Sequence, residues 1–337
     1  MTLLSIYLPV SPERAERFTP YAALAARHGA ARLWAAQSFS FDSHLGIAHA
    51  ARSGHPVPAG TGVALMPLSH PMEAAMRARS TAVATGKPFI AGFGPGSPEF
   101  QRLLAGRAYR SPLTAVREYL AITRGLVRGE AVDLDGTYFS MHGALPPAPH
   151  PPVEVAVGVL RQGMAEVAGE SADAAITWLV PPDHLRGALR PAIEQGAARS
   201  GRPVPRTVCA VSAAVAAPGA DPVRLARIAH QGHFQGAHYR AMLAEAGVPV
   251  DPADPDASAA ALVDSGLFLW GSPEEISEGV RHYFEAGADE VALYFGATAA
   301  VRSEAETLSD IAAVLSVADT DRFLHPSDAQ SEESRTT

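Results

Sequence analysis

The segment Gly60–Pro98 constrains the fold more than any other part of the chain. Its two short apolar runs, residues 61–66 and 88–93, have the composition of strands buried on both faces of a parallel sheet, where strict alternation is not required. Between them a helix can begin around Pro71, a residue type favoured in the first helical turn, and end at Gly86. The segment predicts one βαβ unit, and its two strand ends should meet on a functional face.

Strand-like and helical segments alternate along most of the chain. The eight predicted strands span residues 3–8, 31–36, 61–66, 88–93, 153–157, 173–178, 206–215 and 290–295. Eight strands alternating with helices predict an α/β fold, a single (β/α)8 TIM barrel over residues 1–318. A doubly wound open sheet is the alternative that the same pattern allows.

Three segments depart from this alternation. Asp135-Gly136 lies between β-prone residues and signals a hairpin. Residues 221–270, after the seventh strand, read as an insertion with one helix that carries several histidines and ends at Gly247. The tail, residues 319–337, is rich in Ser, Asp and Glu and is predicted to be disordered.

Composition narrows the class of protein. The 337 residues are 47% hydrophobic with a mean hydropathy of +0.04, enough to bury one large core. No apolar run is long enough for a membrane span, and the N-terminus has no basic leader, so we expect a cytoplasmic protein. Cys209 is the only cysteine, which rules out an internal disulfide. The net charge of −8 argues against an extended nucleic-acid interface.

Short motifs give limited information by themselves. The glycine-rich run at residues 92–96 lacks the frame of a dinucleotide-binding fingerprint. Gly158–Gly163 follows a strand and opens a helix, so free N–H groups there, with Arg161 beside them, could hold a phosphate. His230, His233 and His238 cannot meet one ion on an unbroken helix, and we predict no metal site.

The order of landmarks resembles the luciferase-like family of flavin- or deazaflavin-dependent oxidoreductases. The resemblance rests on YAALAARHGAARLWAAQS, GTGVALMPLSHPMEAA with AGFGPGSPEF, PLTAVREYLAITRGLVRGEAVDLDGTYF, VEVAVGVLRQGMAEVAGESADAAITWL and LWGSPEEISEGVRHYFEAGADEVAL, in that order. These segments span roughly residues 3 to 317.

The resemblance implies a barrel, commonly dimeric, that binds FMN or coenzyme F420 at the C-terminal ends of its strands. The loop after the third strand would support the ring, in some relatives through a non-prolyl cis peptide, and the turn after the fifth would bind phosphate. The implied cofactor-binding residues are Ser38, Ala64, Leu65, Met66, Gly94, Gly96, Ser97, Gly158, Val159, Leu160, Arg161, Gln162 and Gly163. The insertion helix would lie on the substrate side.

The chain departs from the family after the second strand. Many relatives carry an acidic residue or a histidine there, whereas this chain has Gln37 and Ser38, neither of which is a useful general acid or base near neutral pH. Any proton transfer would fall to Asp42, His44, His70, an insertion histidine, or the substrate and solvent. The candidate catalytic residues are Gln37, His44 and His70.

The resulting hypothesis is an oxidoreductase that uses bound F420 for hydride transfer to or from a small organic substrate. An FMN-dependent monooxygenase of the same fold is one alternative, and a non-catalytic barrel that serves as a binding or partner subunit is another. We expect a homodimer. The candidate substrate-binding residues are Phe39, Trp178, His233, Phe234 and His238.

Overall fold

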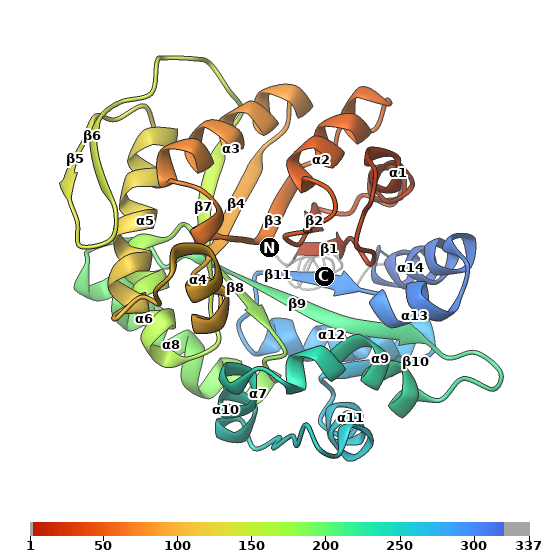
Figure 1. The fold of residues 1–337 in the computed structure, drawn as a ribbon. Helices are drawn as coiled ribbons and strands as arrows, with labels where there is room; N and C mark the ends of the chain where they lie inside the picture. Colours follow the sequence, from red (N-terminus) through yellow and green to blue (C-terminus); the bar gives the residue numbers. More distant parts are fainter. Residues whose placement is uncertain (1–2, 320–337) are drawn as a thin grey trace, which may run out of the picture.

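Parallel strands form a closed barrel in the computed structural model, which describes residues 3–319 (Figure 1). In the order of their hydrogen bonds, and closing back on the first, the barrel strands are β1 (Leu3–Tyr7), β2 (Leu33–Ala35), β3 (Ala59–Leu65), β4 (Phe89–Gly94), β7 (Val153–Gly158), β8 (Ala174–Trp178), β9 (Arg206–Val215) and β11 (Glu290–Tyr294). The (β/α)8 prediction is confirmed, and closure between β8 and β9 excludes the open sheet.

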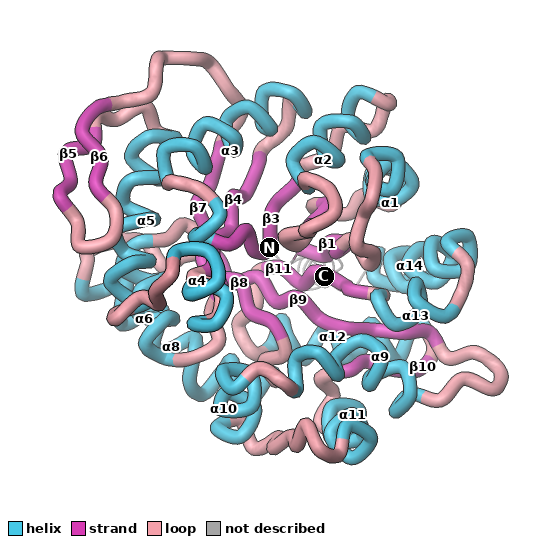
Figure 2. Tube along the Cα trace, viewed as in Figure 1, coloured by secondary structure: helices cyan, strands magenta, loops and turns pink. Residues whose placement is uncertain are grey.

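Helices surround the barrel and bury an outer core between themselves and the strands (Figure 2). The surrounding helices are α1 (Thr19–Arg27), α2 (Ser43–Arg52), α3 (Pro71–Thr85), α5 (Pro112–Val127), α6 (Gln162–Ser171), α8 (Arg190–Arg199), α12 (Pro273–Glu285) and α14 (Glu304–Asp319). Shorter elements are η1 (Ala15–Phe18), η2 (Met66–Leu68), α4 (Pro98–Ala105), α7 (Pro182–His184), η3 (Leu185–Leu189) and α13 (Gly296–Val301). None of the helices in residues 3–319 has the length and apolar character needed to cross a membrane.

Two helices, α2 and α4, lie in segments for which the sequence analysis predicts no helix. Helix α2 begins after Asp42, whose carboxylate accepts hydrogen bonds from the N–H groups of His44 and Leu45. Helix α4 begins after Ser97, whose hydroxyl accepts from the N–H of Phe100. Both are ordinary N-cap residues, so the local start signals were present in the sequence.

The insertion between β9 and β11 contains three helices, α9 (Pro222–Phe234), α10 (Ala237–Glu245) and α11 (Pro255–Asp264), and the strand β10 (Phe268–Gly271), which pairs with the end of β9. The expectation of one histidine helix ending at Gly247 is wrong, because the chain breaks at Gln235 and Gly236 between α9 and α10. In Figures 1 and 2 these elements lie together on one side of the barrel.

The predicted hairpin is confirmed as β5 (Val132–Asp135) paired antiparallel with β6 (Ser140–Gly143). Its turn is held by Glu118 of α5, whose carboxylate accepts hydrogen bonds from the N–H groups of residues 137, 138 and 139. The predicted disordered tail, apart from Asp319, lies outside the described residues.

The inside of the barrel holds a second, smaller core, separate from the outer one. Its buried members are Tyr7, Trp34, Ile90, Ala156, Ala174, Ile176, Val208, Ala210 and Ala292. At the N-terminal ends of the strands this core is closed by the buried Glu290, which accepts hydrogen bonds from the hydroxyl of Ser5 (2.7 Å) and the indole N–H of Trp34 (2.6 Å). At the other end the core opens toward Val63, Trp178 and Tyr294. The mouth of the barrel is therefore at the C-terminal ends of the strands.

Candidate functional site at the mouth of the barrel

Glycine backbone forms part of the inner surface at the mouth. A Cβ atom added to Gly94 of β4 would lie 2.9 Å from Cγ2 of Val63, and one added to Gly158 of β7 would lie 3.4 Å from its Cγ1. Val63 of β3 packs against the inner core, and Gly94 and Gly158 lie on the next two strands, β4 and β7. Because the two glycines have no side chains, the side chain of Val63 packs directly against their backbone.

An irregularity in β3 sets the position of Val63. The register with β4 shifts between Thr61 and Ala64, and the peptide bond between Gly62 and Val63 is cis. The carbonyl of Gly62 accepts a hydrogen bond from the phenol of Tyr7, and the carbonyl of Val63 accepts one from the N–H of Gln37 (3.3 Å). These bonds fasten β3 to β1 and to the loop after β2.

The loop after β4 is fixed by Gln101 of α4. Its buried side-chain amide donates hydrogen bonds to the carbonyls of Pro95 (3.0 Å) and Gly96 (2.9 Å) and accepts one from the N–H of Tyr109 (2.8 Å). Gly96 has a φ of 70°, a conformation that favours glycine. The loop is thus held in one shape above the glycine surface.

The turn after β7 presents the start of helix α6. Arg161 is the N-cap residue, and its side chain makes no capping hydrogen bond, so the first N–H groups of the helix are not covered by it. The N–H of Val159 donates to the carbonyl of Ile176 (2.7 Å), which anchors the turn to β8. Arg161 is exposed and adds a positive charge beside a helix N-terminus, a combination suited to an anion.

The insertion brings aromatic and histidine side chains to the mouth beside β8, the strand next to β7. The indole N–H of Trp178 donates to Nε2 of His233 (3.1 Å), and the rings of Tyr239 and Tyr294 pack against His233 and Trp178, with centroids 4.9 and 5.2 Å away. Because Nε2 of His233 accepts, the neutral ring carries its proton on Nδ1. Burial, followed by the charge of His238, lowers the pKa of His233 to about 4.

Comparison with known proteins identifies the family. The model of a family described as luciferase-like monooxygenases matches residues 5–290, most of the chain. The chain belongs to this family. A 5,10-methylenetetrahydromethanopterin reductase from Methanolobus tindarius is 27% identical over 183 residues, which is 54% of this luciferase-like chain and 56% of the reductase, so the match spans about half of each protein.

Solved structures share the luciferase-like fold over nearly the whole chain. An F420-dependent secondary alcohol dehydrogenase in complex with an F420-acetone adduct has a TM-score of 0.76 at 16% identity, covering 94% of this chain and 99% of its own. Two further structures are similar. The F420-dependent tetrahydromethanopterin reductase of Methanopyrus kandleri has a TM-score of 0.68 at 16% identity, covering 92% of this chain and 97% of its own. The EDTA monooxygenase of Chelativorans sp. BNC1 has a TM-score of 0.70 at 15% identity, covering 94% of this chain and 93% of its own. At these identities the likeness shows the fold alone.

Two predicted catalytic histidines have structural roles in this luciferase-like chain. His44 lies between α2 and α3, where Nδ1 is 2.8 Å from the hydroxyl of Thr81, and burial lowers its pKa to about 4. His70 is the exposed N-cap of α3, and its Nδ1 accepts the N–H of Met72 (3.2 Å). Gln37 does reach the mouth, where its side chain donates to the carbonyl of Ser38 (2.8 Å).

Several predicted contact residues point away from the mouth. The side chains of Met66, Val159 and Phe234 are at most 1% exposed and lie in the outer core, so a cofactor or substrate could reach only the backbone of these residues. The cis peptide lies in β3 rather than in the predicted loop around Leu65. The hydroxyl of Ser97, predicted to contact the cofactor, accepts a hydrogen bond from the N–H of Phe100 as the N-cap of α4.

Other predicted residues remain at the rim or on the turn. Phe39 is 73% exposed and packs against Phe100 of α4, and Ser38 accepts hydrogen bonds from the N–H groups of residues 40 and 41. The residue His238 of α10 is exposed at the rim. Partial burial of its ring, followed by the charge of Arg161, lowers its pKa, and the charge of Glu99 raises it. The helices α10, α6 and α4 therefore come close together there. The partly exposed Ala64 and Leu65, together with Leu160, Gln162 and Gly163, stay candidates.

Sequence reasoning missed several residues at or below the mouth, namely Tyr7, Val63, Ser212 and Tyr294, and it considered His230 only as one of the insertion histidines. For Tyr7 and Tyr294 a signal existed, because both are the last residues of apolar strands and parallel strands present these ends to the mouth. Nothing in the sequence marked Val63, whose direction depends on the shift in β3.

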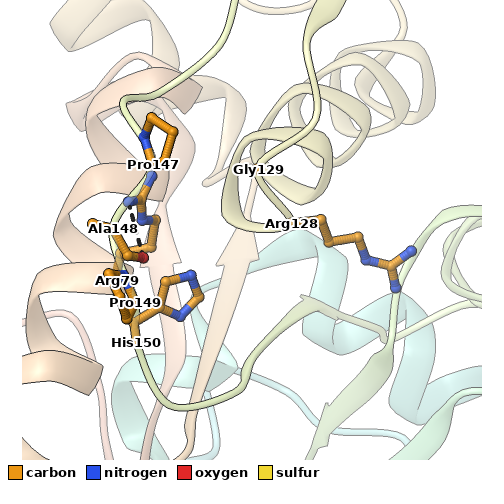
Figure 3. Close-up of a pocket in the computed structure, with 7 residues that line it drawn as sticks. All are labelled: Arg79, Arg128, Gly129, Pro147, Ala148, Pro149 and His150. Carbon is orange, nitrogen blue, oxygen red and sulfur yellow. Dashed lines mark hydrogen bonds between the residues drawn. The ribbon is translucent and has the colours of Figure 1, made fainter.

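A surface pocket beside the connection that leads into β7 contains two arginines. In residues 3–319 no three His, Cys, Asp or Glu side chains gather so that they could hold a metal ion. Figure 3 shows this pocket, which is lined by Arg79, Arg128, Gly129 and Pro147–His150. Arg79 donates there to the carbonyl of Pro146 (2.9 Å), and Arg128 pairs with Asp173 (3.1 Å). Both cations already have partners.

Proposed function

We propose that the protein is an oxidoreductase that binds a flavin-type cofactor at the mouth and acts on a small organic substrate. The observation that carries the proposal is the glycine surface at Gly94 and Gly158 around Val63, beside a helix start with Arg161. A flat ring suits the surface formed by Val63, because Gly94 and Gly158 add no side chains of their own there, and a phosphate suits the helix start. The residues present therefore suit an F420-like or FMN-like group.

The deazaflavin F420 is the favoured cofactor. Two similar structures are described as F420-dependent, although the EDTA monooxygenase and the family description keep an FMN-dependent monooxygenase as the second candidate. When bound, F420 would supply reversible hydride transfer, whereas FMN would support monooxygenation. A non-catalytic binding role remains the outcome if neither cofactor binds.

The protein's own groups would orient the reactants. Tyr7 and Gln37 hold β3, and therefore Val63, against the place where the ring would lie. Trp178 keeps His233 in the tautomer that presents an Nδ1–H donor to the substrate side. Because its pKa is about 4, His233 is neutral at pH 7 and would act by donating a hydrogen bond, not as a positive charge.

We also propose that two copies pair through α2 and α3. These helices and η2 expose Leu45 (62%), Leu68 (43%), Met72 (41%), Met76 (53%) and Val83 (55%). Large exposed apolar side chains gathered on adjoining helices are typical of a protein–protein interface. Sedimentation of the intact protein and of a Met76→Glu variant tests this: the first should be a dimer and the second a monomer.

Titration of the purified protein with F420 and, separately, with FMN tests the main proposal. Absorption and fluorescence of the cofactor should report micromolar binding, tighter for F420. Gly158→Val is the matching variant, because a Cβ there meets only ordinary contacts and the fold should tolerate it, while the added methyl groups occupy the ring surface. Failure of both cofactors to bind would overturn the enzyme proposal, and tighter binding of FMN would replace hydride transfer with monooxygenation.

A further inference from the structure

Several polar atoms are buried near Trp178 without partners. His230 of α9 is 0% exposed and Ser212 of β9 is 3% exposed. Among residues 3–319, neither ring nitrogen of His230, nor the hydroxyl of Ser212, nor Nδ1 of His233 has a hydrogen-bond partner. Buried polar atoms are almost always paired, so such a set calls for an explanation.

These atoms belong to one place. Strand register puts Ser212 beside Phe268 on one side and Tyr294 on the other. The ring of Phe268 lies 6.4 Å from that of His230, and Trp178 lies 5.8 Å from His230 and 5.2 Å from Tyr294. The two histidine rings are 5.6 Å apart. We call Ser212, His230 and His233 the histidine cluster; aromatic rings surround it.

The chemistry of the histidine cluster selects for an uncharged polar group. Burial, followed by the neighbouring His233, lowers the pKa of His230 well below its usual range, so the ring is neutral at pH 7. Two neutral imidazoles and a hydroxyl offer both donors and acceptors but no net charge. A carboxylate or an ammonium group would lose its hydration here without a counter-ion, and an apolar group would leave the cluster unpaired.

We infer that the histidine cluster receives the hydroxyl or carbonyl oxygen of an uncharged, otherwise apolar substrate. A hydroxyl can donate and accept at once, and the surrounding rings suit an apolar body. Trp178 and His233 are partly exposed at the mouth, and His230 lies one helical turn from His233 and is buried. The inference rests on the proposed function, since it names the substrate class of the same site.

Long-range ¹H–¹⁵N spectra of protein labelled with ¹⁵N-histidine test the inference directly, because ring ¹⁵N shifts report hydrogen bonds. The probes are cyclohexanol and cyclohexanone, compared with cyclohexanecarboxylate and cyclohexylammonium. The signals of His230 and His233, assigned by their loss in His230→Phe and His233→Phe, should move only with the two uncharged probes. Movement with the charged probes alone, or with none of the four, would overturn the inference.

His230→Phe separates a binding role from a structural one. Replacing unpartnered nitrogens should leave the melting temperature unchanged or higher, while cyclohexanol binds roughly three- to tenfold more weakly, the loss of about one hydrogen bond. The matched control is His44→Phe, which breaks the bond to Thr81 and should melt lower with unchanged probe affinity. A lower melting temperature in His230→Phe with unchanged probe affinity would make His230 structural.

The same samples are titrated with F420 and FMN, so that the two proposals can fail separately. His230→Phe should bind the cofactor as the unaltered protein does, because His230 is buried on α9, whereas the glycines and the Arg161 turn belong to β4, β7 and the start of α6. If histidine signals respond to cyclohexanol while neither cofactor binds, the substrate site stands and the redox function falls. If a cofactor binds while no histidine signal responds, the redox function stands and the substrate site is refuted.

Discussion

Both ends of the barrel bury polar side chains, but the two ends differ in how many of these side chains have hydrogen-bond or ion-pair partners. At the N-terminal end Glu290 accepts from Ser5 and Trp34 and lies 3.6 Å from Arg32 Nε and 3.7 Å from Arg206 Nη1. At the C-terminal end the side chains of the histidine cluster have one hydrogen bond within residues 3–319, from Trp178 to His233.

The difference shows which end is completed by folding alone. At the N-terminal end Arg32 Nε and Glu290 Oε2 have no hydrogen bond within residues 3–319, but each faces an opposite charge within 4 Å. The C-terminal end leaves polar atoms and glycine backbone for which folding gives no partner. In barrels of this type the first end serves stability and the second serves chemistry. Four experiments test this division.

Removing the carboxylate at the N-terminal end should have the largest effect. Glu290→Ala leaves the buried guanidinium group of Arg32 without its carboxylate and the donors of Ser5 and Trp34 without an acceptor, so unfolding free energy should fall by about 3–5 kcal/mol. Urea unfolding measures it. Glu278→Ala, which breaks an exposed pair with Arg281, should cost less than about 0.5 kcal/mol. Equal losses in the two variants would refute the division.

Acidification should lower the free energy of unfolding, because buried neutral histidines resist protonation in the folded chain. Burial lowers the pKa values of His44 and His233 to about 4 and that of His230 well below its usual range. Between pH 6.5 and 4 the unfolded chain therefore binds protons that the folded chain does not, so stability is full above pH 6.5 and falls as the pH drops. Each histidine contributes up to about 1.4 kcal/mol per pH unit. In urea unfolding at several pH values, His230→Phe should show a shallower slope, and an unchanged slope would contradict the burial of a neutral His230.

Arg161→Ala should affect binding and not stability. Losing the charge beside the start of α6 should weaken cofactor binding by about 2 kcal/mol, roughly thirtyfold, if a phosphate binds there. Arg161 is exposed, so unfolding free energy should change by less than about 0.5 kcal/mol. Arg52→Ala, at the far end of α2, is the control and should change neither. Unchanged cofactor affinity in Arg161→Ala would remove the phosphate from this turn.

The smallest effect tests the hydrogen bond at the mouth. Trp178→Phe keeps a ring in place but removes the donor to His233, which should cost about 1 kcal/mol of unfolding free energy. Trp270→Phe on β10 makes the same change of ring away from the histidine cluster and serves as the reference. If both variants lose the same unfolding free energy, the hydrogen bond from Trp178 to His233 makes no measurable contribution to stability.

The positions of the barrel strands and the hairpin could be predicted, because apolar runs and turn residues are local signals. The direction of side chains at the mouth could not. Simple alternation from Gly60 would turn Ala64 and Met66 inward, but the shift in β3 turns Val63 inward and places Met66 in the outer core. Neighbouring residues on a helix also diverge by about 100°, so His233 faces the mouth while Phe234 is buried in the outer core.

His44 shows a second limit of sequence reasoning. Its place after the second strand suggested a catalytic role, yet the unpredicted helix α2 carries it between helices, against Thr81 and Phe89. The roles of His230 and Ser212 were equally hidden, since only packing reveals that their polar atoms have no partners in the described chain. Local sequence signals therefore identify the end of the barrel that matters better than the side chains that act there.

The break between α9 and α10 has a consequence for how such a protein could diversify. His230, His233, His238 and Tyr239 all come from one stretch of ten residues that is attached to the barrel after β9. The turn with Arg161 and the glycines near Val63 come from other strands. Exchange of this one stretch between relatives could change substrate preference in a single genetic step while the cofactor site is inherited intact.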